Sequence, residues 1–148
     1  MKRIFFNEEV CMGCGLCEVS CLVQHSTSKD AIKAYKSEEH KPISRVKVFV
    51  DRPSAFAVQC QHCEDSPCVT ACLSGAMHRD EKTGMVIHDA EKCRGCWTCI
   101  MVCPYGAIRM DVAKRKVVAK CDLCSELDVP VCVANCPNEA LVCKEVTP

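Results

Sequence analysis

The stretch that decides the fold of this chain is Cys93-Arg94-Gly95-Cys96-Trp97-Thr98-Cys99-Ile100-Met101-Val102-Cys103-Pro104. Its cysteines are separated by two, two and three residues, and a proline follows the last one. Three cysteines in so tight a loop can bind three corner irons of a cubane cluster while backbone N–H groups point at the sulfurs. The spacing matches the bacterial C-x2-C-x2-C-x3-C-P run that binds 4Fe–4S clusters.

The chain contains four such groups of four cysteines, each opening with C-x2-C and closing with C-x3-C. In chain order, the groups are Cys11, Cys14, Cys17, Cys21 (group one); Cys60, Cys63, Cys68, Cys72 (group two); Cys93, Cys96, Cys99, Cys103 (group three); and Cys121, Cys124, Cys132, Cys136 (group four). A closing cysteine one helical turn beyond the third cannot return to the same cluster and binds a neighbouring one. The four groups therefore predict four 4Fe–4S clusters in two pairs.

The cysteine content also bears on where the protein works. The chain has 17 cysteines in 148 residues, a fraction that indicates covalent or metal scaffolding. The segment Met1–Glu9 contains acidic residues by position 8 and leaves no room for a signal sequence before Cys11. No stretch approaches the roughly 18 apolar residues of a membrane helix. We expect a cytoplasmic protein without a membrane span, in a reducing compartment where thiols bind metals.

Two other uses of the cysteines stay open. A secreted disulfide framework fits poorly, because an odd total of 17 cannot pair completely. A structural zinc protein is the second alternative, but zinc sites take their ligands from two separated C-x2-C pairs and often include histidine. The C-x3-C step that recurs in all four groups has no place in that scheme.

Charge excludes one class of partner. Lysine and arginine total 19, as do aspartate and glutamate, so there is no basic surplus for nucleic acid. Ligation would ionise sixteen thiols, and four oxidised clusters return about two positive charges each, which leaves about −8 on the loaded protein. The insertion at residues 22–59 has a basic surplus of three. It is either a solvated loop or a docking surface for a partner.

An internal repeat accompanies the cysteines. An alanine and then a bulky apolar residue stand at the fourth and fifth positions after three closing cysteines, as Ala76-Met77, Ala107-Ile108 and Ala140-Leu141. Hairpins are expected around Gly84 (residues 78–88) and from Ile108–Asp111 to Lys116–Ala119 across 112–115. The other expected elements are strands at Lys2–Phe6 and Ser44–Asp51 and short helices at Cys17–His25, Ser28–Ser37 and Trp97–Cys103. Small sheets and short helices around the clusters make an α+β fold.

The four groups resemble the four-cluster ferredoxin-like electron-transfer subunits of anaerobic oxidoreductases. That family includes the iron–sulfur subunits of dimethyl sulfoxide reductase, formate dehydrogenase and several hydrogenases. The stretches Cys60–Cys68, Cys93–Trp97 and Gln24–Ser26 look most like the ferredoxin-like subunit that accompanies carbon monoxide dehydrogenase. The corresponding subunits of aldehyde oxidoreductases, formate dehydrogenases and hydrogenase complexes share this arrangement of cysteine groups, so they stay as alternatives.

The resemblance implies two nested bacterial-ferredoxin-like domains with two clusters each. The inner domain would be residues 53–117, and the outer one residues 1–52 plus 118–148, with an insertion at 22–52. The implied ligand sets are Cys11, Cys14, Cys17 with Cys136; Cys121, Cys124, Cys132 with Cys21; Cys60, Cys63, Cys68 with Cys103; and Cys93, Cys96, Cys99 with Cys72.

No catalytic set of residues stands out, and sixteen ligands for four clusters leave no open iron. The sequence predicts an electron-transfer subunit and not an enzyme. It would connect a catalytic subunit, carbon monoxide dehydrogenase, to a second redox partner such as a hydrogenase or an NAD(P)-linked flavoprotein. We expect His62 to donate a hydrogen bond near a cluster, Trp97 and Tyr105 to shield one, and Cys143 to lie in a buried strand.

Overall fold

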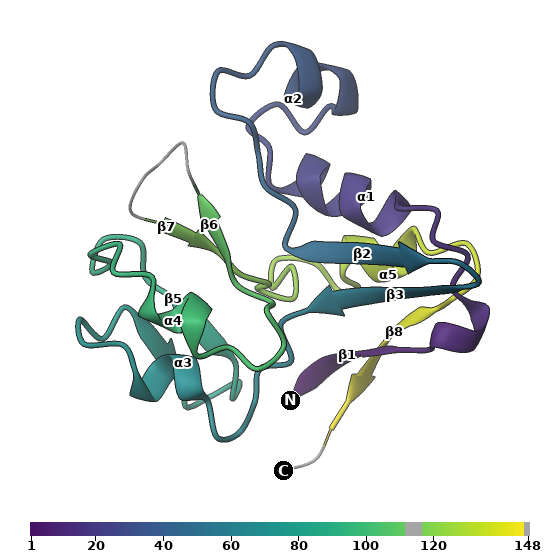
Figure 1. Cartoon of the computed structure of the whole chain (residues 1–148). Coiled ribbons are helices and arrows are strands. Elements are labelled where there is room, and N and C mark those ends of the chain that lie inside the picture. The colour runs from purple at the N-terminus through teal and green to yellow at the C-terminus, as the bar shows by residue number, and fades with distance from the viewer. Residues whose placement is uncertain (112–116, 147–148) are drawn as a thin grey trace.

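The computed structural model describes residues 1–111 and 117–146, and within them the chain folds as short helices and two-stranded sheets (Figure 1). The helices are α1 (Leu16–Gln24), α2 (Ala31–Lys36), α3 (Pro67–Thr70), α4 (Thr98–Met101) and α5 (Val131–Ala134), with a 3-10 turn η1 (Glu8–Val10). The expected α+β class is confirmed. None of the described helices is long and apolar enough to cross a membrane.

Four antiparallel strand pairs are present in the described residues. They are β1 (Lys2–Phe6) with β8 (Leu141–Glu145), β2 (Val46–Asp51) with β3 (Ser54–Gln59), β4 (Met77–Arg79) with β5 (Val86–His88), and β6 (Arg109–Asp111) with β7 (Val117–Ala119). Both expected hairpins and the expected strands at the N-terminus and in the insertion are confirmed. The turn expected at 112–115 lies outside the described residues, and β3 was not predicted.

Local sequence signals fix where two of the helices begin. Asp30 caps α2 by accepting a hydrogen bond from the Lys33 N–H at 2.8 Å. Pro67 opens α3, where the missing N–H has no cost. The expected helix at Ser28–Ser37 is confirmed over six of its residues. In Figure 1, α2 stands at the outer end of the insertion, above α1.

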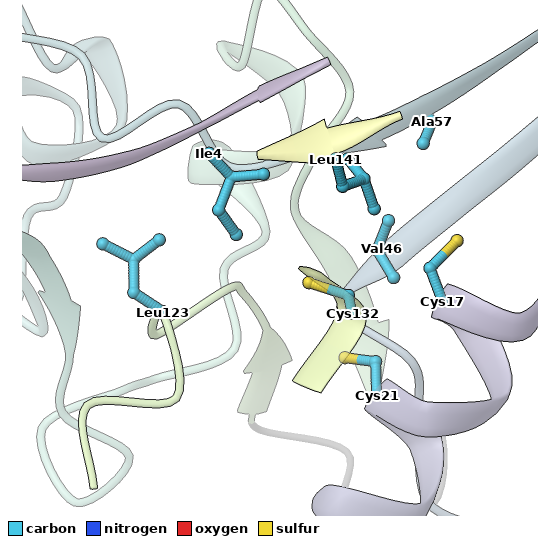
Figure 2. Packing of buried hydrophobic residues seen from close by; sticks show 8 residues of the cluster. All are labelled: Ile4, Cys17, Cys21, Val46, Ala57, Leu123, Cys132 and Leu141. Carbon is cyan, nitrogen blue, oxygen red and sulfur yellow. The ribbon is translucent and has the colours of Figure 1, made fainter. Parts of the chain in front are cut away.

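Apolar side chains gather in two cores. The first contains Ile4, Cys17, Cys21, Val46, Ala57, Leu123, Cys132 and Leu141. Figure 2 shows the cysteines of α1 and α5 facing Val46 and Leu141 in this core. The second contains Cys68, Met77, Val86, Cys99, Ile108 and Val118. Groups one and four thus share one core, and groups two and three share the other.

The repeated alanine and apolar residue form part of these cores. Ala76, Ala107 and Ala140 are 1%, 5% and 2% exposed, and Met77, Ile108 and Leu141 are equally buried. Helix α1 packs against α5, and α3 packs against α4. Each of these helices contains the third cysteine of a group, so the packing brings two groups together in each half of the molecule.

Candidate iron–sulfur cluster sites

All four groups open with the same backbone turn. The residue two positions after each opening cysteine has a left-handed conformation, with φ of 68° at Gly13, 47° at His62, 69° at Gly95 and 56° at Leu123. This region costs a non-glycine residue about 1–2 kcal/mol, yet two of the four positions are not glycine. The turn aims the backbone at the sulfur: the N–H groups of His62 and Leu123 each lie 3.4 Å from the opening Sγ of their group.

Three groups also close alike. A second left-handed residue follows three positions after the closing cysteine, at Gly75, Gly106 and Glu139. Beyond it, the chain returns a donor to the sulfur: the Met77 N–H is 3.3 Å from Cys72 Sγ, and the Ala140 N–H is 3.2 Å from Cys136 Sγ. Amide donors of this kind stabilise a metal-bound thiolate.

Group one closes differently, because α1 continues past Cys21 to Gln24. No left-handed turn can then return a local N–H to the Cys21 sulfur. The donor comes from the insertion instead, where the Arg45 N–H lies 3.2 Å from Cys21 Sγ. This part of the insertion therefore contributes directly to a candidate cluster site.

A hollow at group one has the chemistry that a cubane cluster needs. It measures about 360 Å³ including its open mouth, and Cys11, Cys14, Cys17 and Cys136 line it. Apolar side chains that include Phe6, Val48 and Leu141 form the rest of its wall. Four thiols in an apolar hollow, together with amide donors aimed at sulfur, fit a 4Fe–4S cluster.

Electrostatic neighbours show which cysteines of groups one and four meet. Burial raises the pKa of Cys17 to about 11, and the Cys136 and Cys14 thiols add to the rise. Burial likewise raises the pKa of Cys132 to about 12, with contributions from Cys21 and Cys124. The closing cysteine of each group therefore lies beside cysteines of the other group.

Groups two and three interleave in the same way. Burial raises the pKa of Cys68, and Cys60 and Cys103 raise it further while Lys120 opposes them. Burial raises the pKa of Cys99 to about 11, and Cys93, Cys68 and Cys72 raise it further. Thiolates so close together repel one another until bound iron supplies positive charge. Among the described residues, no three Cys, His, Asp or Glu side chains are close enough to bind a single metal ion.

A polar network surrounds Cys21. His25 Nδ1 lies 2.7 Å from the Cys21 carbonyl oxygen and 3.6 Å from its Sγ, and Nε2 lies 3.4 Å from Asp122. Arg45 pairs with the same carboxylate. Although burial alone would lower it, hydrogen bonds to Asp122 and Cys21 raise the pKa of His25 to about 9. Sequence reasoning missed this network, because Arg45 and Asp122 are 77 residues apart.

Three other expectations need adjustment. His62 is 1% exposed, but its ring accepts a hydrogen bond from the Val86 N–H at 3.1 Å, and only its backbone N–H reaches a cysteine sulfur. Burial lowers its pKa to about 3, so the ring is neutral. Trp97 packs against the second core, whereas Tyr105 is 53% exposed. Cys143 lies in β8 as expected but is only half-buried.

Comparisons with known proteins agree with this chemistry. A family model described as a 4Fe-4S dicluster domain matches residues 53–146. The putative electron transport protein YsaA of Escherichia coli (strain K12) is 38% identical over 98% of this chain and 90% of its own length. Electron transport protein HydN of the same strain is 38% identical over 96% of this chain and 87% of its own length.

A more distant relative and a solved structure extend the comparison. The thiosulfate reductase electron transfer subunit PhsB of Salmonella typhi is 33% identical over 91% of this chain and 71% of its own length. The fold also matches a chain in a structure of the active site complex BamBC of benzoyl-coenzyme A reductase. The match covers 97% of this chain and 76% of that chain. Its TM-score is 0.53 at 24% identity, which is a likeness of fold. The chain therefore belongs to the ferredoxin-like 4Fe–4S dicluster family of electron-transfer proteins.

Proposed function

We propose that this chain holds four 4Fe–4S clusters and conducts electrons along them between a catalytic oxidoreductase and a second redox protein. The observation that carries the proposal is the hollow at group one, which Cys136 of group four lines together with Cys11, Cys14 and Cys17. The charges of Cys21, Cys72 and Cys103 likewise act on cysteines of another group, which supports crossed closing cysteines. Each cluster supplies one-electron transfer when bound. The protein supplies ligands, hydrogen bonds to sulfur and apolar cover.

The proposed ligand sets follow these neighbours. One cluster takes Cys11, Cys14, Cys17 and Cys136, the four cysteines that line the hollow at group one. The other three sets are Cys121, Cys124, Cys132 with Cys21; Cys60, Cys63, Cys68 with Cys103; and Cys93, Cys96, Cys99 with Cys72. Every group contributes three ligands to one cluster and its closing cysteine to another.

We also propose that the two pairs occupy nested domains, residues 53–117 inside residues 1–52 plus 118–148. Two separate cores support this division, since one collects groups one and four and the other groups two and three. The proposed boundary between 52 and 53 falls in the turn of the β2–β3 hairpin, and Ala57 of β3 packs in the first core. At the other proposed boundary, Val118 of β7 packs in the second core. Strands β3 and β7 thus each pack in the core of the other proposed domain.

We propose first the class of the catalytic partner and then specific candidates. The name of the relative PhsB, an electron transfer subunit of thiosulfate reductase, supports a catalytic oxidoreductase as one partner. Carbon monoxide dehydrogenase is our first candidate, on the sequence resemblance, with aldehyde, formate and hydrogenase complexes as alternatives. A hydrogenase or an NAD(P)-linked flavoprotein would be the second partner.

Metal analysis tests the number of clusters. Protein purified without oxygen is expected to carry about 16 irons and about 16 acid-labile sulfides per chain. About eight of each would contradict the four-cluster proposal, and about four zinc ions in a colourless protein would contradict iron–sulfur ligation altogether.

Double substitutions test the crossed ligand sets. Cys11→Ala/Cys136→Ala removes two ligands of one proposed cluster, so about 12 irons are expected to remain. Cys121→Ala/Cys136→Ala removes ligands of two clusters, so about eight are expected to remain. Cys143→Ser, a substitution of the cysteine outside the four groups, is the matched control and keeps the full count. Equal iron in the two double variants would contradict the crossing.

A further inference from the structure

Lys120 is a buried lysine at the junction of the two halves of the molecule. Lys120 is 5% exposed and directly precedes Cys121, the opening cysteine of group four. The Nζ ammonium donates hydrogen bonds to the Val86 carbonyl oxygen at 2.5 Å and to the Cys121 carbonyl oxygen at 3.0 Å. Val86 belongs to the second core, so this side chain reaches from group four into the half that contains groups two and three.

The ammonium has no carboxylate partner in the part of the chain that the structure describes. No Asp or Glu within residues 1–111 and 117–146 lies at ion-pair distance from it. Asp122 stands two positions away, but its carboxylate is paired with Arg45 and His25. Two carbonyl oxygens satisfy hydrogen bonds without neutralising the charge, and a buried uncompensated charge is costly. The site of Lys120 therefore calls for negative charge from another source.

Groups two and four supply that charge at this place. Lys120 directly precedes Cys121 of group four, and Val86, whose carbonyl oxygen it binds, packs with Cys68 of group two in the second core. The charge of Lys120 in turn acts on Cys68 of group two and on the neighbouring His62. Four thiolates around an oxidised cluster carry a net charge of about −2. The proposed clusters of groups two and four would each be anionic, and their charge would offset the ammonium that joins the group four loop to the second core.

We propose that Lys120 is a fixed positive charge between the two cluster pairs and that it raises the reduction potentials of the clusters at this junction. These are the clusters bound by Cys60, Cys63 and Cys68 and by Cys121, Cys124 and Cys132, so the inference rests on the ligand sets proposed above. Each reduction adds one negative charge, so a nearby ammonium stabilises the reduced form more than the oxidised form. The role of Lys120 would be electrostatic, and no bond to it would form or break.

The test is an EPR-monitored redox titration of iron-loaded full-length protein. Lys120→Met removes the charge and the donor, Lys120→Gln removes the charge but keeps a donor, and Lys120→Arg keeps the charge. In both neutral variants, we expect the ratio of reduced to oxidised junction clusters at a fixed potential to fall roughly tenfold. That change is a potential shift of about 59 mV for one electron. Lys120→Arg is expected to retain the wild-type potentials.

Lys92 offers a matched control. It also directly precedes the opening cysteine of a group, but its side chain is 62% exposed and pairs with Asp89 at 3.4 Å. Because water screens this charge, Lys92→Met is expected to leave all potentials unchanged.

Iron content separates this inference from the proposed function. Wild-type protein with fewer than about 16 irons would contradict the ligand sets themselves. Fully loaded neutral variants with unchanged potentials would overturn the role of Lys120 and leave the ligand sets intact. If neither neutral variant can be loaded while Lys120→Arg can, the requirement for charge is supported. Failure of the arginine variant as well would show a purely geometric role and would overturn the inference.

Discussion

At the scale of single residues, Asp122 joins parts of the chain that are far apart in sequence. It lies between two cysteines of group four and binds Arg45 from the insertion and His25 from the end of α1. Both partners also contact Cys21, through the Arg45 N–H and the His25 ring. One carboxylate thus holds the groups that fix a closing cysteine in place.

Asp122→Asn is expected to accelerate cluster loss at neutral pH. The pKa of His25 is raised to about 9, so its contribution to stability is complete below about pH 6.5 and is lost as the pH rises through 9. A neutral amide in place of the carboxylate cannot hold this charge. At alkaline pH the wild type should lose the part of its advantage that comes from His25 and keep the part that comes from the Arg45 pair. The Asp122 side chain is 45% exposed, so water screens the pairs and we expect about 1 kcal/mol, or about fivefold in rate.

The decay of visible cluster absorbance in air measures this rate at several pH values. Asp128→Asn, a substitution of an exposed acid in the same group, serves as the control. Equal decay rates of Asp122→Asn and wild type at pH 6 would show that the network does not protect the cluster.

At the scale of elements, the β2–β3 hairpin supports the loop of group one. A Cβ atom at Gly13 would lie 2.9 Å from Val50 Cγ2 and 3.2 Å from Ala55 Cβ, the side chains on either side of the hairpin turn. Ala57, further along β3, lines the hollow between the group one cysteines. The loop of group one therefore has room to pack on β3 only because the residues of β3 that face it are small.

Gly13→Ala is expected to destabilise the loaded protein more than Gly15→Ala does. Both glycines have a positive φ, so both substitutions incur about 1 kcal/mol of backbone strain. Only Gly13→Ala also collides with the hairpin, whereas nothing lies within 4 Å of a Cβ at Gly15. We expect a further loss of about 1–3 kcal/mol from this overpacking.

Thermal unfolding of the two variants under anaerobic conditions checks the difference. Equal unfolding temperatures for the two variants would mean that the hairpin adjusts to the added methyl group without loss of stability. The hairpin would then not support the loop of group one.

The same hairpin shows what sequence could and could not predict. The strands predicted at Lys2–Phe6 and Ser44–Asp51 are present because these stretches are rich in apolar and β-branched residues, although β2 begins at Val46. Strand β3 was missed because its alanines give a weak strand pattern. At Ala55 a small side chain leaves room for the loop of group one at Gly13. The spacing of the cysteines predicted which residues could bind clusters, but no local signal placed Arg45 beside Asp122.

At the scale of the whole molecule, cluster binding changes the charge that the sequence suggests. The apoprotein has a formal charge of zero and a sequence pI of about 6.9. With the four clusters proposed above, sixteen ionised thiols and four oxidised clusters would bring the loaded protein to about −8. The segment 22–59, with its basic surplus, would then be a positively charged segment of a protein whose net charge is negative.

Isoelectric focusing without oxygen is expected to place loaded protein well below pH 6.9. Protein stripped of iron and sulfide should focus close to pH 6.9 and lose its folded circular dichroism, because the two cores contain few large apolar residues and many cysteines. The same focusing position with and without iron would contradict thiolate ligation at all sixteen cysteines.

The pairing of β1 with β8 has a consequence for the order of events in the cell. Cys11, Cys14 and Cys17 leave the ribosome more than a hundred residues before Cys136, which lies just before β8. Groups two and three, in contrast, are complete by Cys103. With the proposed ligand sets, cluster insertion into the middle of the chain could therefore begin during translation, whereas the sites at its two ends would wait for nearly the whole polypeptide to be released. A ribosome that stalls before Cys121 would leave the four cysteines of group one without the group four cysteines that complete their proposed sites.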